Sequence, residues 1–89
     1  MTIPELQIPE DDSPDLADDE IERAIPTDNA NDVSQKVVAE IRGSPGTQLG
    51  GHELRRRKPH LYWRVKLQMS TGEQRTLIFL ADWLQQKAP

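Results

Sequence analysis

Residues 60–69 alternate strictly between apolar and other side chains, and this pattern constrains the fold more than any other feature of the chain. A period of two over ten residues predicts a β-strand with one face in a core and the other face exposed. The residues expected to face the core are Leu61, Trp63, Val65, Leu67 and Met69.

A turn and a second strand are expected directly after this segment. Gly72 lies in a polar stretch that suits a turn, and residues 74–80 are rich in β-branched and large apolar side chains. The two segments predict a β-hairpin at about residues 60–80. The spacing of Ser70 and Glu73 also resembles a capping box, so a helix that begins at Ser70 is the alternative.

Residues 32–42 fit two descriptions. Val33, Val37 and Ile41 recur at every fourth position, and Gly43 follows as a stop signal, which predicts a helix. Apolar residues also stand at alternate positions of the same segment, which would make it a third strand of the sheet. We predict the helix and keep the strand as the alternative.

The other segments complete an α+β fold class. Glycines and prolines punctuate residues 43–59, which predicts a loop, and residues 81–87 predict a short terminal helix with Trp83 and Leu84 as apolar anchors. We therefore expect a small antiparallel sheet with one or two short helices, preceded by a disordered acidic arm.

The charges divide the chain into two parts. Residues 1–32 hold eleven acidic side chains and one basic side chain, a net charge of −10, whereas residues 33–89 hold four acidic and ten basic side chains, a net charge of +6. Low hydrophobicity with high net charge is typical of disorder. We predict a disordered acidic arm at 1–31 and a small basic folded module at 32–89.

One part of the arm has a helical pattern at residues 14–25. Ser13 can cap it, Pro14 suits the first helical position, and apolar residues then gather on one face. An isolated helix of this length is marginal in water, so we expect it to form on a partner or to remain a solvated linker. The residues predicted to contact a protein partner are Leu16, Asp18, Asp19, Glu20, Ile21 and Ile25.

Several function classes find no support in the sequence. The two histidines, His52 and His60, lack companions at the spacing of a metal site or a catalytic pair, so we expect no enzyme, no metal and no cofactor. The chain has no cysteine, which fits a reducing compartment, and no apolar run long enough for a bilayer. A cytoplasmic protein that does not contact membranes is the expectation.

The basic residues suggest a nucleic-acid surface. Four consecutive basic residues lead into the 60–69 strand, whose exposed face adds further basic and aromatic side chains at intervals of about 7 Å. This interval is similar to the repeat of a nucleic-acid backbone, and Tyr62 can stack on a base. The predicted nucleic-acid-binding residues are Arg55, Arg56, Arg57, Lys58, His60, Tyr62, Arg64 and Lys66.

Two functions follow as hypotheses. The first is a small, non-enzymatic accessory or regulatory protein that binds DNA or RNA and whose acidic arm modulates the basic sheet face. The second is a protein-binding adaptor or inhibitor whose acidic arm engages a basic partner, for example by mimicking nucleic acid. A homodimer is a further expectation, because a module of this size has a small core.

Overall fold

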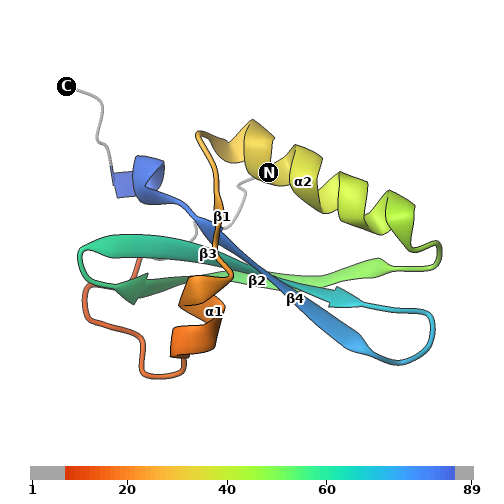
Figure 1. Cartoon of the computed structure of the whole chain (residues 1–89), viewed down its shortest axis with the longest axis horizontal. Helices are drawn as coiled ribbons and strands as arrows, with labels where there is room; N and C mark the ends of the chain where they lie inside the picture. The colour runs from red at the N-terminus through yellow and green to blue at the C-terminus, as the bar shows by residue number, and fades with distance from the viewer. Residues whose placement is uncertain (1–7, 86–89) are drawn as a thin grey trace, which may run out of the picture.

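The protein has an α+β fold in which a four-stranded, mostly antiparallel sheet is covered by one main helix (Figure 1). This description comes from a computed structural model that describes residues 8–85. None of the helices in that part of the chain is long and apolar enough to cross a membrane. The elements are α1 (Asp18–Glu22), β1 (Ile25–Pro26), α2 (Ala30–Gly43), β2 (Gln48–Arg57), β3 (His60–Gln68), β4 (Gln74–Leu80) and the 3-10 helix η1 (Asp82–Gln85).

The predicted hairpin is confirmed. Strands β3 and β4 pair in antiparallel register, with Trp63 opposite Phe79 and Gln68 opposite Gln74. Gly72 takes a φ of 92° in the turn, a conformation that a residue without a Cβ adopts at little cost. A helix beginning at Ser70 is therefore wrong.

The helical prediction for residues 32–42 is also confirmed, since α2 spans Ala30–Gly43. The Asn29 side chain caps it by accepting a 2.8 Å hydrogen bond from the Asp32 N–H. Val33 is buried against the sheet, and Val37 and Ile41 pack beside it. These residues lie on one side of a helix and not on one side of a third strand.

The loop predicted at residues 43–59 is wrong for most of its length. Strand β2 occupies Gln48–Arg57 and pairs antiparallel with β3 from Gln48↔Gln68 to Arg57↔His60. The sheet accommodates the glycines through a bulge between Leu49 and Gly51, where one strand gains an extra residue. Pairing with a well-formed neighbouring strand thus outweighs the weak strand propensity of this segment.

The strand order is β1-β4-β3-β2, and β1 adds to β4 in parallel. One face of the sheet, here called the helix face, packs Val65, Leu67 and Phe79 against α2. η1 follows β4, and the indole N–H of Trp83 donates a 3.0 Å hydrogen bond to Thr27 Oγ1. The expected terminal helix at 81–87 is thus the short η1, and Gln86 and Lys87 lie outside the described residues.

Residues 8–24 lie against the sheet, so this part of the predicted disordered arm is ordered, whereas residues 1–7 of that prediction lie outside the described residues. This segment, here called the strap, passes the β2 edge, crosses the sheet face opposite α2 and continues into β1 beside β4 (Figure 1). Leu16 is only 2% exposed, in a cluster with Tyr62 and Ile78. The composition of the strap by itself predicts disorder, because the basic and apolar residues that contact it lie in β2, β3 and β4, later in the chain.

The helical part of the strap is shorter than the predicted 14–25 segment. α1 contains five residues, Asp18–Glu22, and three of its four acidic residues lie in the first turn, where they complement the helix dipole. The division of the chain into an arm at 1–31 and a module at 32–89 stays a prediction.

Candidate nucleic-acid interface

The sheet face beneath the strap, here called the strap face, carries most of the basic residues that the sequence singled out. Side chains alternate between the faces of a strand, so Tyr62, Arg64 and Lys66 of β3 share this face. Their cross-strand neighbours on β2 are Arg55 beside Tyr62 and Glu53 beside Arg64. The register therefore places one acidic side chain in the middle of a basic surface.

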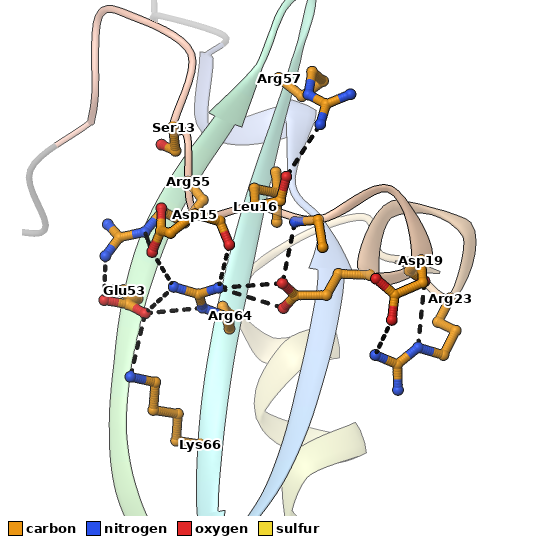
Figure 2. Close-up of polar contacts among 12 residues, drawn as sticks. Ser13, Asp15, Leu16, Asp19, Arg23, Glu53, Arg55, Arg57, Arg64 and Lys66 are labelled. Atoms are coloured by element: carbon orange, nitrogen blue, oxygen red, sulfur yellow. Dashed lines mark hydrogen bonds and ion pairs between the residues drawn. The ribbon is translucent and has the colours of Figure 1, made fainter.

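Arg64 is the centre of this surface and is only 8% exposed (Figure 2). Its Nε and Nη2 donate to Glu53 Oε1 at 2.8 and 2.6 Å, and Nη2 also donates to Asp15 Oδ2 at 2.6 Å. Nη1 lies 3.4 Å from Glu20 Oε2. Two of these three carboxylates, those of Asp15 and Glu20, belong to the strap, so the strap supplies part of the counter-charge of a buried guanidinium.

Two further cations extend the cluster around Arg64. Arg55 donates from Nε to Asp15 Oδ2 at 3.0 Å and from Nη2 to Glu53 Oε2 at 2.5 Å. Lys66 Nζ lies 3.5 Å from Glu53 Oε1 (Figure 2). Three cations and three carboxylates thus form one connected network across β2, β3 and the strap.

The network shifts the pKa values of its members. The hydrogen bond from Arg64 lowers the pKa of Asp15 below its ordinary value. Burial acts to raise the pKa of Glu53, but the hydrogen bond and charge of Arg64, together with Arg55 and Lys66, lower it overall. Burial also opposes the charged form of Arg64, yet Asp15 and Glu53 raise its pKa. All three groups are therefore held in their charged forms.

The strap is fixed to the β2 edge by main-chain hydrogen bonds. The Ser13 N–H donates to the Arg56 carbonyl at 2.8 Å, and the Arg56 N–H donates to Ser13 Oγ at 3.0 Å. The Lys58 N–H donates to Asp12 Oδ1 at 2.8 Å. Farther along, Arg57 Nη1 lies 3.0 Å from Asp18 Oδ1.

Apolar packing holds the strap beside these polar contacts. Leu16 packs with Tyr62 and Ile78, and Ile21 and Ala24 lie against the same cluster. Tyr62 is only 4% exposed, and burial raises the pKa of its phenol. With the strap in place, the ring of Tyr62 is covered and has no free face for stacking.

The structure groups only some of the predicted nucleic-acid-binding residues. Arg55, Arg57, Tyr62, Arg64 and Lys66 share the strap face, whereas strand alternation directs Arg56 elsewhere, and its Nε donates to the Pro9 carbonyl at 2.5 Å. Lys58 lies in the exposed turn that precedes β3. His60 Nδ1 lies 2.7 Å from Asp82 Oδ2, so this histidine is already partnered.

The predicted partner-binding residues of the strap divide in a similar way. Leu16 and Ile21 face the protein's own sheet, and Ile25, in β1, packs against the core beneath α2. The Asp18 side chain is 86% exposed, and Asp19 is also exposed and pairs with Arg23, which follows the last residue of α1. Glu20 points at Arg64. The three predicted apolar contact residues, Leu16, Ile21 and Ile25, already pack against other parts of the same chain.

Sequence reasoning missed Ser13, Asp15 and Glu53 as members of this site. The signal for Glu53 was present, because it is the one acidic residue between His52 and Lys66. It went unused because the segment was assigned to a loop, in which no cross-strand partner is defined. Among residues 8–85, no group of three or more His, Cys, Asp or Glu side chains is arranged to hold a metal ion.

No protein-family model, curated protein or solved structure matches this chain.

Proposed function

We propose that this protein is a small, non-enzymatic, nucleic-acid-binding accessory or regulatory protein whose acidic strap modulates access to its basic sheet face. The observation that carries the proposal is the pairing between the two. Asp15 contacts Arg64 and Arg55, and Asp18 contacts Arg57. The strap carboxylates thus occupy positions beside the same cations that phosphates would contact.

The ion pairs between the strap and the partly exposed cations of the basic face are weak enough for phosphates of a nucleic acid to replace the strap carboxylates. The ion pairs that the strap makes with the partly exposed Arg55 and Arg57 contribute about 0.2–1 kcal/mol each, whereas its pair with Arg64 is buried and harder to replace. A nucleic acid can replace several of them at once and gains further from the release of its counterions. The apolar contacts of Leu16 oppose departure of the strap from the sheet, since burying a leucine side chain contributes about 2 kcal/mol. The strap is therefore expected to weaken binding without preventing it.

A salt series with labelled oligonucleotides, both single-stranded and duplex, tests the proposal by fluorescence anisotropy. The double variant Asp15→Asn/Asp18→Asn removes the strap charges that pair with the basic face and keeps Leu16. We expect it to bind roughly tenfold more tightly than the wild type at low salt, with a steeper fall in affinity as salt rises.

The matched control is Asp19→Asn/Glu22→Gln, which removes the same number of charges from exposed positions of α1. It is expected to bind more weakly than the Asp15/Asp18 variant. Absence of salt-dependent binding in all three proteins would overturn the nucleic-acid function. Equal affinities of the two double variants would instead overturn the role of the strap.

The adaptor hypothesis is the second candidate, and no contact of the strap favours it, because Leu16 and Ile21 already face the sheet. It predicts a protein complex that forms only when the strap leaves. For either function we propose the cytoplasm as the location.

A further inference from the structure

Tyr62 lies among the cations of the strap face. Arg55 is its direct neighbour on β2, Leu80 is its neighbour on β4, and Arg64 follows two positions farther along β3. Arg57 stands two positions after Arg55, on the same side of β2. One aromatic ring and three guanidinium groups therefore share one surface of the sheet.

The strap places a carboxylate at each end of this group of cations. Asp15 Oδ2 lies 2.6 Å from Arg64 Nη2 and 3.0 Å from Arg55 Nε. Asp18 Oδ1 lies 3.0 Å from Arg57 Nη1. Side chains two positions apart on a strand are separated by about 7 Å, which is similar to the separation of successive phosphates in an extended nucleic-acid strand. Two phosphates can therefore take the positions of the two carboxylates.

Between these carboxylates the strap carries an apolar side chain. Leu16 is almost fully buried and packs with Tyr62 and Ile78. Arg57 Nη2 donates a 3.0 Å hydrogen bond to the Leu16 carbonyl, which holds the strap backbone at this point (Figure 2). The order carboxylate, apolar side chain, carboxylate along the strap corresponds to phosphate, base, phosphate along a single nucleic-acid strand.

Departure of the strap uncovers apolar surface as well as charge. Tyr62 and Ile78 lose the cover of Leu16 and meet water, which costs free energy. A base stacked on the tyrosine ring covers this surface again, and such a stack contributes about as much as burying a leucine side chain. A duplex presents phosphates and base edges, whereas its base faces are stacked within the helix.

On the basis of the nucleic-acid binding proposed above, we infer that the ligand of the strap face is a single-stranded nucleic acid, with one base stacked on Tyr62 in the place of Leu16. Phosphates on either side of this base contact Arg55 and Arg57, the cations that the strap carboxylates otherwise neutralise. Every base has a face that can stack, so the ring selects single strands over duplexes and does not select a sequence.

Fluorescence anisotropy of the full chain with three probes tests this inference. The probes are oligothymidine of about 24 nucleotides, an oligomer with the same backbone but no bases, and a mixed-sequence duplex with the same number of phosphates. Charge alone favours the duplex, which carries its phosphates closer together. The wild type is nevertheless expected to bind oligothymidine at least about tenfold more tightly than either other probe, because only oligothymidine offers free base faces.

Two substitutions of Tyr62 separate stacking from charge. Tyr62→Leu removes the ring and keeps an apolar side chain beside Leu16, whereas Tyr62→Phe keeps the ring. The measured quantity is the ratio of the affinities for oligothymidine and for the oligomer without bases, because opening of the strap changes both affinities by the same factor. Tyr62→Leu is expected to lower this ratio at least about fivefold, and Tyr62→Phe to recover most of it. Circular dichroism and the thermal midpoint establish that each variant is folded.

The outcomes distinguish the single-strand inference from the proposed function. A wild-type ratio near one, tighter binding of the duplex than of oligothymidine, or a ratio that Tyr62→Leu does not lower would overturn the stacked single strand and leave nucleic-acid binding in place. The first two of these results require no variant. Absence of salt-dependent binding to all three probes would overturn nucleic-acid binding itself.

Discussion

At the scale of single residues, Arg64 shows why a residue type does not define its role. The sequence places Arg64 among solvent-facing cations, because it alternates with core residues. In the structure it is buried by the strap and donates hydrogen bonds to the carboxylates of Asp15, Glu20 and Glu53. An arginine suits this position because its planar fork can bond several carboxylates at once.

Glu53→Gln tests the energetic weight of this network through its pH dependence. The pKa of Glu53 is lower in the folded protein than its ordinary value of 4.5, so the carboxylate stabilises the fold above that pH. The stabilisation is lost as the pH falls from about 4.5 through the lower folded value, because the unfolded chain takes up the proton first. We expect the free energy of unfolding of the wild type to exceed that of Glu53→Gln by about 1–2 kcal/mol at pH 7.

The difference between the two proteins should shrink as the pH falls below 4.5 and through the lowered pKa of Glu53 in the folded protein, because a protonated glutamate resembles glutamine. Thermal or urea unfolding at several pH values measures it. Glu73→Gln, in the exposed β3–β4 turn, is the control and should match wild type throughout. A Glu53→Gln penalty that is constant with pH would contradict a charge-based role.

At the scale of elements, the sequence predicted those whose signals are local. The β3–β4 hairpin and α2 follow from alternation, from a glycine turn and from a four-residue period, all of which are contained within each segment. β2 escaped prediction because its glycines and charge run resemble a loop, and only its pairing with β3 makes it a strand. The strap escaped because Leu16 has its partners in β3 and β4, more than 40 residues away along the chain.

The connection between α2 and β2 depends on Gly46. It has a φ of +88°, and a Cβ at this position would lie 2.8 Å from Ser70 Cβ. Gly46→Ala should therefore destabilise the protein by about 1–3 kcal/mol, from backbone strain and the close approach together.

Gly43→Ala provides the comparison, because Gly43 is the last residue of α2 and a Cβ there meets nothing within 4 Å. It should be neutral or stabilising by up to about 1 kcal/mol, as expected for alanine in a helix. Urea unfolding of both variants measures the difference, and similar effects of the two substitutions would contradict the role of Gly46.

At the scale of the whole molecule, opposite charges meet within one chain. The acidic strap lies on the basic face of the sheet, and α2 covers the other face, so the charge split of the sequence becomes a contact in the fold (Figure 1). The sequence predicted only some of the cations of the basic face correctly, because strand alternation places Arg56 on the other face from Arg55 and Arg57. We propose that the strap and a nucleic acid use the same surface.

Amide hydrogen exchange with and without a saturating oligonucleotide tests whether the strap and the oligonucleotide compete. The amides of Ser13, Arg56 and Lys58 report strap attachment, because each donates one of the hydrogen bonds between the strap and the β2 edge or the turn after it. We predict that oligonucleotide binding accelerates exchange at these amides and across residues 13–24, while the β3–β4 ladder keeps its protection. Unchanged or stronger protection of the strap at saturation would show that the oligonucleotide does not use the surface under the strap.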